Sequence, residues 1–499
     1  MMPSSIFGFP MKRQRNVLIG DISKFLILAV IFLCSIRILA AAMVPFTDTT
    51  EARYAEIARK MVETQDWITP YFDYGIPFWG KPPLHTWMAA IGFKIWGTSE
   101  LAGRIFFASV SLFLILILFD FVRKEVNRHI ALWTIFILCS SGLFFGSIAF
   151  VSTDIPLTFG CVMIMLAFWR YHECTAPNYR AILGFAFGLT IGFLAKGPIV
   201  ILIVGVAVLA WTSFIGRWSV LFNTNWIIGI CLFLIMSLPW FVIAELRTPG
   251  FAYYFFVEEH FYRFLISGWE GDRYGNGHAF HKGKIWLDWG IAFAPWSILL
   301  IGGYIYRVIQ KEVCRPTAWL RSKTPSLESY LLCWIISPLI IFTMSANILT
   351  AYVLPAIPAT AILTALVVRD LGLSKYIQLT GIQIVTIFYC LMIAVLLLNT
   401  DNRLLKSERA TAEWVYGNFD DVDITYLGKR SFSLEFYSAG QVERIDHIQD
   451  VEMLLENDQQ DALVLLQSDL SLLSDEYQER FYAPYMTNRR AILIEKWEQ

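Results

Sequence analysis

Four ionisable side chains that suit acid–base chemistry and anion binding lie in one polar stretch of an otherwise apolar chain. Asp48 and Glu51 are separated by two residues, and Arg53 and Lys81 follow them. Two neighbouring carboxylates can divide the work, because one can take a proton from an attacking hydroxyl while the other orients a cation. The alternative is an ordinary helix start, where acidic residues are favoured by the positive end of the helix dipole. The pair alone leaves both interpretations open.

Lys81 and two further charged residues adjoin turns or the ends of apolar runs. Lys81 lies between Gly80 and Pro82, beside two aromatic residues, and a fixed ammonium there suits a phosphate at the membrane surface. Asp154 lies between two apolar runs, where a carboxylate needs a partner or a wet cavity, although it also suits a helix cap. Lys196 precedes Gly-Pro, and it suits either phosphate binding or a side chain that reaches towards the interface.

Two later segments add weaker candidates. His260 and Arg263 share one face of a helix-like segment, which by itself favours an amphipathic interfacial helix. Tyr352 precedes Pro355 and Pro358, and prolines inside a span are tolerated where the backbone lines protein or a cavity. These features weakly indicate a groove that accepts a lipid.

A metal site and a nucleotide site have little support in the sequence. His278 and His281, with Glu270 and Asp272, could ligate a divalent metal, but their loose spacing favours a solvated loop. The cofactor is therefore left open between none and a divalent metal. The chain has no Gly-rich phosphate loop, so nucleotide binding is unsupported, and we expect no nucleic-acid partner.

Membrane-spanning helices must position these residues. Of the 499 residues, 56% are hydrophobic and 16% are charged, whereas a soluble chain carries about 25% charge. Runs near 20 residues are long enough to cross a hydrocarbon core of about 30 Å. Hydropathy predicts about 11 spans, centred near residues 33, 113, 140, 162, 187, 206, 234, 296, 336, 360 and 388.

Charge distribution predicts both a domain boundary and an orientation. The chain carries 20 acidic and 10 basic residues from Asp401 onward, against 21 and 30 before it. Basic residues fall largely in alternate loops, which places the N-terminus in the cytoplasm and the first loop and the tail outside. We therefore predict a multi-span membrane domain at 1–400, with a catalytic first loop at 44–104, and a soluble extracytoplasmic α/β domain at 401–499.

Periodicity predicts the elements of the first loop and of the tail. In the loop we expect a helix over 50–62, capped by Thr50, with Tyr54, Ile57 and Met61 on the membrane surface, and a second helix over 84–96. In the tail we expect strands at 424–427, 432–437, 442–445, 462–466 and 491–494 and helices at 404–416, 448–455 and 471–481.

Five motifs together resemble the bacterial polyprenyl-phosphate-sugar glycosyltransferases of the GT-C class. They are TEARYAEIAR from Thr50, DWITP from Asp66, FWGKPP from Phe78, AKGP from Ala195 and YVLPAIP from Tyr352. Their order and intervals match as well. That class contains the lipid A aminoarabinose transferase and, more distantly, the protein O-mannosyltransferases. The resemblance implies an α-helical integral membrane enzyme of about 11–13 transmembrane helices. It implies an active site outside the cytoplasmic membrane and a transfer that inverts the configuration at the sugar carbon.

The resemblance also implies roles for individual residues. The acid of the first loop that is essential in the family matches Asp48 or Glu51. Many relatives carry Asp-Glu directly before Ala-Arg-Tyr, but here the aspartate position is Thr50, and the lysine that many carry before Tyr-x-Leu-Pro is missing from 345–350. We expect Asp48 to be the base, with Glu51 supporting or replacing it. The other expected positions are Asp154 as a further acid, Arg53, Lys81 and Lys196 at the donor phosphate, and Tyr54, His260, Arg263 and Tyr352 in the substrate cavity.

The leading hypothesis is an inner-membrane glycosyltransferase. It would move a sugar from undecaprenyl phosphate to lipid A, lipopolysaccharide or another envelope acceptor. The enzyme itself would lie in contact with membrane lipids. One alternative is an enzyme like the protein O-mannosyltransferases. Another is a transporter or flippase of lipid-linked sugars, although internal repeats and charges at the midplane are expected of transporters. A scaffold role stays open for the tail alone.

Overall fold

The computed structural model divides the chain into two compact units, which are described separately. The first comprises Met1–Leu39, Phe78–Leu84 and Phe106–Leu391, and the second comprises Ala40–Pro77, His85–Ile105 and Met392–Gln499. The polar first loop therefore contributes to both units. The structure describes residues 11–173, 178–275, 280–309, 326–398, 405–419, 422–456, 460–487 and 490–496.

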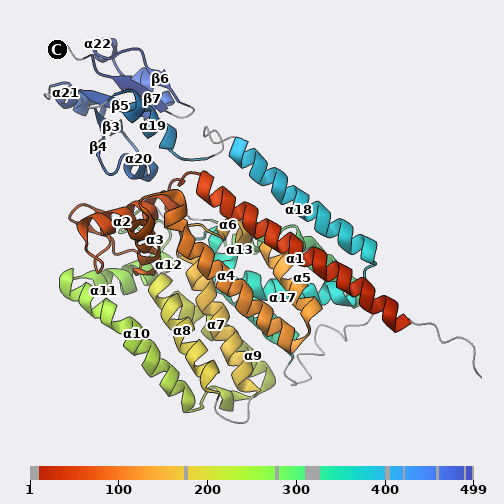
Figure 1. Ribbon diagram of the computed structural model, residues 1–499. Helices are drawn as coiled ribbons and strands as arrows, with labels where there is room; N and C mark the ends of the chain where they lie inside the picture. Colours follow the sequence, from red (N-terminus) through yellow and green to blue (C-terminus); the bar gives the residue numbers. More distant parts are fainter. Residues whose placement is uncertain are drawn as a thin grey trace, which may run out of the picture. The chain divides into compact units, whose positions relative to one another are not determined.

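Apolar helices build the first unit (Figure 1). Among the described residues, seven helical segments are long and apolar enough to cross a membrane, or eight if one pair bent by 103° counts as a span. The seven are 22–43 within α1 (Met11–Met43), α4 (Glu100–Glu125), α7 (Asp154–His172), α8 (Tyr179–Lys196), α10 (Asn225–Arg247), Thr350–Asp370 (η3 with α17, Ile357–Asp370) and α18 (Lys375–Leu398). The bent pair is α13 (Lys284–Ala292) with α14 (Trp296–Ile309).

Three shorter apolar helices explain why the sequence indicated about 11 spans. They are α5 (Arg128–Cys139), α9 (Ile199–Ile215) and α16 (Leu327–Thr343). Each predicted centre falls on an apolar helix or, at residue 140, directly after one. At a rise of 1.5 Å per residue, the 12 residues of α5 extend only about 18 Å, short of a full crossing. Hydropathy detects an apolar segment but not the length of its helix. Here the break before α6 (Gly142–Ser147) ends the helix early.

Helices α7 and α8 pack against each other through small residues and run side by side (Figure 1). A Cβ atom on Gly160 would lie 2.6 Å from the carbonyl oxygen of Gly188 and 2.8 Å from the backbone nitrogen of Gly192. Glycine at this crossing therefore lets the two backbones approach closely. This contact fixes the start of α7, which carries Asp154, and the end of α8, which carries Lys196.

Gly160→Ala should separate α7 from α8 and destabilise the protein by about 1–3 kcal/mol, because its methyl group would overlap backbone atoms. Gly184→Ala is the matched control, since its Cβ would make an ordinary 3.5 Å contact with Ala167. Thermal unfolding in detergent compares the two variants. Equal melting temperatures would contradict the close packing at Gly160.

The segment after α10 contains an unusual helix. Short α11 (Phe251–Tyr253) leads into the π-helix η2 (Tyr254–Tyr262), and α12 (Arg263–Leu265) follows. Extended π-helix is rare and is found frequently at functional sites. Among the remaining described elements of this unit are the 3-10 turns η1 (Trp218–Val220) and η3 (Thr350–Ala356).

The second unit combines most of the first loop with an α/β part. The loop supplies α2 (Thr50–Thr64), the hairpin β1 (Tyr71–Asp73) with β2 (Ile76–Pro77), and α3 (Leu84–Trp96) from His85 onward. The sheet order is β4-β3-β5-β7-β6, with β3, β4 and β5 parallel and β7 antiparallel to both neighbours. The strands are β3 (Asp423–Leu427), β4 (Val442–Ile445), β5 (Asp461–Leu466), β6 (Tyr485–Met486) and β7 (Arg490–Ile494).

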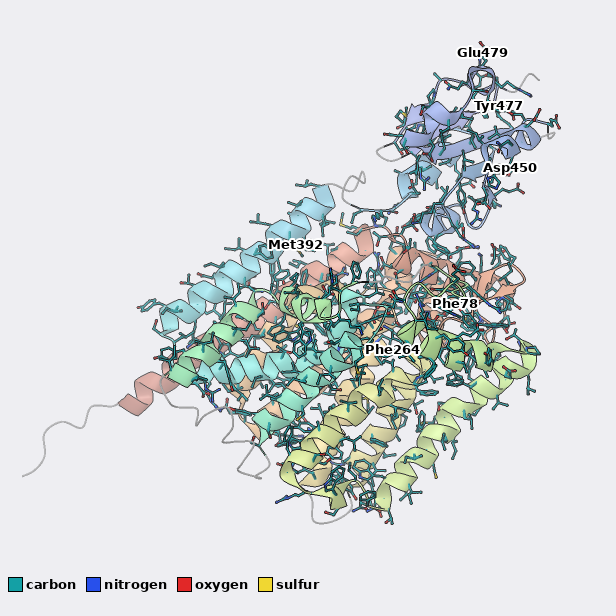
Figure 2. The ribbon with its side chains drawn as sticks, turned by 180° about the vertical axis from the view of Figure 1, so that it is seen from behind. Phe78, Phe264, Met392, Asp450, Tyr477 and Glu479 are labelled. Atoms are coloured by element: carbon teal, nitrogen blue, oxygen red, sulfur yellow. The ribbon has the colours of Figure 1, made fainter. Side chains whose placement is uncertain are left out.

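Both faces of this sheet carry an apolar core. Figure 2 draws the side chains of this unit and labels Asp450, Tyr477 and Glu479. One core centres on Ile424, Leu434 and Val464, and the other centres on Leu463, Leu465 and Leu493. Alternating side chains of a strand point to opposite faces, so β5 contributes to both cores. The short helices are α19 (Arg409–Asn418), α20 (Phe432–Tyr437), η4 (Ile448–Asp450), α21 (Val451–Leu454), η5 (Gln467–Leu472) and α22 (Asp475–Glu479).

Several local predictions were wrong. The segment 432–437 is helix α20 rather than a strand, because Ser431 caps it by accepting the backbone N–H of Leu434 at 3.3 Å. Thr49, not Thr50, is the N-cap of α2, and its side chain makes no cap hydrogen bond. The expected helix 471–481 is reduced to α22 and part of η5.

The predicted membrane-surface face of α2 is buried in protein. Tyr54, Ile57 and Met61 are at most 4% exposed. The sequence correctly predicts the apolar face of α2, but this face packs against another part of the chain instead of the membrane. The predicted helix from residue 404 begins outside the described residues, and the described helix starts at Arg409.

Candidate functional site

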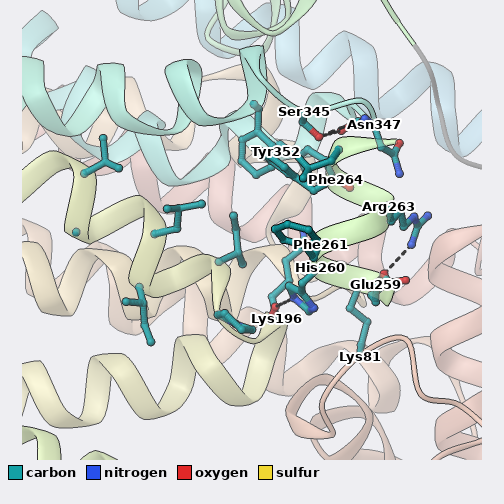
Figure 3. A pocket seen from close by; sticks show the side chains of 18 of the residues that line it. Lys81, Lys196, Glu259, His260, Phe261, Arg263, Phe264, Ser345, Asn347 and Tyr352 are labelled. Atoms are coloured by element: carbon teal, nitrogen blue, oxygen red, sulfur yellow. Dashed lines mark hydrogen bonds and ion pairs between the residues drawn. The ribbon is translucent and has the colours of Figure 1, made fainter. Parts of the chain in front are cut away.

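A cavity of about 720 Å³ lies within the first unit (Figure 3). One part of its wall carries charged side chains from the Phe78–Leu84 segment, α8, η2 and α12. The rest is mostly apolar and includes much of α9. Its charged or ionisable lining residues are Lys81, Lys196, Glu259, His260 and Arg263, and its other lining residues include Ile201, Leu202, Leu209, Phe261, Phe264, Phe342 and Tyr352.

Glu259 joins two cations at the charged end. Its Oε1 accepts hydrogen bonds from Lys81 Nζ and from Arg263 Nη1, the latter at 2.6 Å. Arg263 Nη2 also lies 3.1 Å from Asp272 Oδ2. Glu259 is 4% exposed and Lys81 is 15% exposed. The cluster therefore fixes two cations beside the cavity through one buried carboxylate.

The turn that carries Lys81 is anchored by its aromatic neighbour. The Trp79 backbone N–H donates to the Tyr274 hydroxyl at 2.9 Å, and the Trp79 indole N–H donates to Thr248 Oγ1 at 3.1 Å. The prolines after Lys81 stiffen the chain further. The ammonium is thus held in place by the surrounding backbone.

Lys196 is oriented by a second carboxylate. Its Nζ lies 2.5 Å from Asp154 Oδ1 and 4.6 Å from the centre of the Tyr352 ring. The Lys196 carbonyl lies 3.1 Å from His260 Nε2, and His260 Nδ1 lies 2.6 Å from the carbonyl of Phe255. A neutral imidazole carries one ring N–H, so it donates to one of these carbonyls at a time. His260 therefore links η2 to the end of α8.

Among the residues that line this end of the cavity, three cations face one carboxylate, Glu259. Asp154 and Asp272 pair with two of these cations from outside the lining. Burial favours a neutral Glu259, but the charges of Lys81 and Arg263 outweigh burial and hold its pKa below the ordinary value. Burial lowers the pKa of Lys81, and the neighbouring Arg263 and Lys196 add to that effect although Glu259 opposes it. Burial and Lys81 likewise lower the pKa of His260. A further anion would offset this excess of cations in the lining.

The second unit holds the two acids of the first loop. Glu51 is 1% exposed, and both of its oxygens accept hydrogen bonds from Arg104, at 2.8 Å to Nε and 2.7 Å to Nη2. Arg104 also donates to the carbonyls of Ala41, Val44 and Pro45. This buried pair fixes the end of α1 and the start of α2.

Asp48 is half-buried and accepts hydrogen bonds from two serines. Ser433 donates its backbone N–H to Oδ1 at 2.9 Å and its hydroxyl to Oδ2 at 2.7 Å, while the Ser431 hydroxyl donates to Oδ2 at 2.9 Å. Burial raises the pKa of Asp48 above its ordinary value, although these hydrogen bonds act against that effect. Asp48 is thus a carboxylate in contact with hydroxyl groups.

Glu51→Ala should lower the free energy of unfolding by about 3–5 kcal/mol, because the Arg104 charge would stay buried without its carboxylate. Glu63→Ala is the matched control on the same helix; Glu63 is 51% exposed, and its pair with Arg59 should contribute under about 1 kcal/mol. Thermal unfolding in detergent distinguishes the two. A Glu51 variant as stable as wild type would exclude a structural role for this pair.

The predicted residues thus fall into two sets. Lys81, Lys196, His260, Arg263 and Tyr352 line one cavity, and Asp154 pairs with Lys196. Asp48, Glu51, Arg53 and Tyr54 belong to the second unit. There the Arg53 guanidinium lies 5.2 Å from the Tyr54 ring centre, and Tyr54 packs against His85 with ring centres 4.3 Å apart.

Sequence reasoning missed two charged residues. Glu259 lies four residues before Arg263, and that spacing pairs opposite charges on a helix, so the signal was present. Arg104 carried no such signal, because its partner Glu51 lies 53 residues away in sequence. Among the described residues no group of three or more His, Cys, Asp or Glu side chains could hold a metal ion. His278, a candidate ligand, lies outside the described residues.

A second, polar cavity of about 440 Å³ lies within the second unit. Its basic lining residues Lys60, Arg430 and Arg444 balance the acids Glu56, Asp73 and Glu435. Arg430 Nε lies 2.6 Å from Glu435 Oε1, and Lys60 Nζ lies 3.6 Å from Glu56 Oε1. The charges of these lining residues therefore balance, whereas the lining of the first cavity has more cations than carboxylates.

Comparison with known proteins identifies the fold class of this chain. Residues 22–255 match the family described as dolichyl-phosphate-mannose-protein mannosyltransferase. The solved structure of ArnT from Cupriavidus metallidurans, bound to undecaprenyl phosphate, has the same fold: the TM-score is 0.75 at 17% identity, covering 95% of this chain and 98% of that one. The protein is therefore a multi-pass membrane protein with the GT-C fold.

Two curated relatives match part of the chain. Both are named undecaprenyl phosphate-alpha-4-amino-4-deoxy-L-arabinose arabinosyl transferase. The protein from Edwardsiella ictaluri is 28% identical over 320 residues, 63% of this chain and 54% of that protein. The one from Yersinia pestis (strain Pestoides F) is 30% identical over 332 residues, 64% and 55% of the two chains. The chain thus spans about half the length of these relatives. These matches bear out the resemblance: the chain is similar in sequence to the aminoarabinose transferases and the protein mannosyltransferases, and it shares the GT-C fold.

Proposed function

We propose that this protein transfers a sugar from a polyprenyl phosphate, such as undecaprenyl phosphate, to lipid A, lipopolysaccharide or another envelope acceptor. The observation that carries the proposal is the first cavity, which joins a cationic end to a long apolar wall. A polyprenyl phosphate has the same two parts, an anionic head and a hydrocarbon tail. The superfamily and the curated relatives' names support a donor of this kind.

In this proposal Lys81, Arg263 and Lys196 bind the donor phosphate. Arg263 offers a planar fork that suits phosphate oxygens, and the lysines act as point charges. The same cations stabilise the negative charge that develops on the phosphate as it leaves. Residues of α9 and Phe264 contact the polyprenyl chain. Arg53 is proposed as a further phosphate contact from its motif alone, and Tyr54 as a substrate contact.

The reaction follows from these groups. An acceptor hydroxyl attacks the anomeric carbon, the bond from that carbon to the phosphate oxygen breaks, and the phosphate departs with the electron pair. We assign Asp48 as the base that takes the hydroxyl proton, because it matches the essential first-loop acid of the family that the motifs resemble, it is only half-buried, and burial raises its pKa. Glu51 is assigned a positioning role, since it is 1% exposed and its charge is paired with that of Arg104. Asp154 holds Lys196, and His260 and Tyr352 shape the cavity around it.

The location follows the same proposal. We place the protein in the bacterial inner membrane with its N-terminus in the cytoplasm and residues 401–499 outside as a soluble domain. The positive-inside pattern of the loops supports this orientation. The reaction would then take place on the extracytoplasmic face, where envelope acceptors are available.

Mass spectrometry of lipid A and core from a deletion strain tests the function. We expect a sugar-sized mass to disappear in the deletion strain, to return with wild-type protein, and to stay absent with Lys81→Met. An unchanged glycolipid profile, with a sugar lost from surface proteins, would favour the mannosyltransferase-like alternative. No lost sugar on either acceptor, with accumulation of the lipid-linked donor inside, would favour a flippase.

A further inference from the structure

The charged end of the first cavity contains two polar atoms without a hydrogen-bond partner among the described residues. They are Glu259 Oε2 and Arg263 Nε, both fully shielded from solvent. Glu259 Oε1 is fully engaged by Lys81 and Arg263, so the second oxygen is the one available to a ligand. Burying such atoms without a hydrogen-bond partner destabilises the protein. Both side chains line the cavity (Figure 3), so a bound ligand can supply the missing partners.

The two atoms differ in their hydrogen-bonding requirements. A carboxylate oxygen only accepts, and the Arg263 Nε–H only donates. A hydroxyl both donates and accepts, so it can satisfy either atom, and one hydroxyl or two adjacent ones can satisfy both. An ammonium group only donates, so it would satisfy Glu259 alone. Phosphate oxygens accept from Arg263, but they would repel the unpaired oxygen of Glu259.

Proximity to the phosphate-binding cations limits which hydroxyl is involved. Glu259 contacts Lys81 and Arg263 directly, and both of these bind the donor phosphate in the proposed function. In a glycosyl phosphate the anomeric carbon is bonded to the phosphate oxygen, and the next ring carbon carries the nearest hydroxyl. That hydroxyl is the sugar group with the shortest reach to the Glu259–Arg263 pair.

We propose that Glu259 and Arg263 form a sugar-recognition pair that selects donors with a free hydroxyl on the carbon next to the anomeric carbon. This inference rests on the proposed function. Glu259 is a binding and positioning residue here, and it takes no proton in the reaction. Its place on the π-helix η2 is consistent with such a role, since π-helical segments frequently occur at functional sites.

The inference also explains why an acid lies among cations that bind phosphate. A carboxylate there weakens the attraction of the cavity for a phosphate that carries no sugar. When the donor binds, the contact between the sugar hydroxyl and Glu259 offsets that loss. A donor that carries its sugar should bind better than the sugar-free product. The site would then release the polyprenyl phosphate after transfer.

The test measures donor binding to the full chain in nanodiscs. The probes are undecaprenyl phosphate, undecaprenyl phosphate-4-amino-4-deoxy-L-arabinose and the same donor without its 2-hydroxyl. For wild type we expect removal of the 2-hydroxyl to weaken binding about 10- to 100-fold. Glu259→Gln should weaken binding of the intact donor by a similar factor and remove the difference between the two donors. Its affinity for undecaprenyl phosphate should stay equal or rise.

Glu258→Gln is the matched control, because it makes the same chemical change one residue away and does not line the cavity. It should bind all three probes as wild type does. Wild type that binds both sugar donors equally, or a Glu259→Gln variant that loses undecaprenyl phosphate as strongly as the donor, would overturn the inference. If wild type binds no undecaprenyl phosphate, the proposed function itself fails first.

Discussion

Asp48→Asn should reduce sugar transfer by about 100- to 10,000-fold, the contribution typical of a general base. The amide keeps the size of the side chain and one acceptor oxygen, but it cannot take a proton from the acceptor hydroxyl. Transfer is measured in membrane vesicles with a lipid-linked donor. Donor affinity should change little, because Asp48 interacts with Ser431 and Ser433 and does not line the cavity that holds Lys81, Lys196 and Arg263.

A serine variant separates catalysis from anchoring. Asp48 accepts from the backbone and hydroxyl of Ser433, so this aspartate also caps the region of α20. Ser433→Ala removes one of these hydrogen bonds and leaves the carboxylate in place. If Asp48 is the base, this variant keeps most of the activity. A loss as large as that of Asp48→Asn would show that the aspartate acts by anchoring the C-terminal segment.

The pH dependence gives an independent check on Asp48. A base must be ionised, and burial holds the pKa of Asp48 above the ordinary value of 3.8. Transfer should therefore fall with decreasing pH as Asp48 becomes protonated, and the fall should begin at a higher pH than for an exposed aspartate. Measuring kcat/KM against pH tests this expectation, because kcat/KM reports the free enzyme.

The sequence predicted elements whose signals are local. The helix α3 was predicted at its observed bounds, because the prolines before it and the glycine after it punctuate an apolar run. Strands β3, β4, β5 and β7 were found to within one residue from their apolar content. Helix α20 was missed, since six residues with apolar side chains at alternate positions are too short to distinguish helix from strand.

The candidate site was only partly predictable, because its contacts join distant parts of the chain. The Lys81 position followed from the stiff turn around it, but its partner Glu259 lies 178 residues away. Ser433, which holds Asp48, is 385 residues away. A hydropathy pattern contains no information on such pairs. The sequence therefore predicts most of the cations of the cavity, whereas the buried carboxylate of Glu259 between them is evident only from the structure.

Lys81→Met should weaken binding of undecaprenyl phosphate about 100-fold or more, because removing one partner of a buried charge pair costs several kcal/mol. The cavity loses a cation, and the Glu259 carboxylate then faces the phosphate with only Arg263 to neutralise it. Lys94→Met is the matched control, since Lys94 is exposed and lies in the same loop. Binding is measured in nanodiscs, and equal affinities for the two variants would exclude Lys81 from the phosphate site.

A double variant tests the electrostatic reason for that loss. Lys81→Met with Glu259→Gln removes one charge of each sign, so the net charge of the cavity returns to that of wild type. Binding of undecaprenyl phosphate should recover in part relative to Lys81→Met alone.

The pKa of Lys81 provides a pH test of the same site. Burial lowers this pKa below 10.5, so the affinity of the wild-type protein for undecaprenyl phosphate should begin to fall at a lower pH than with an ordinary lysine. In Lys81→Met this alkaline loss should disappear, and its persistence would assign the titration to another cation.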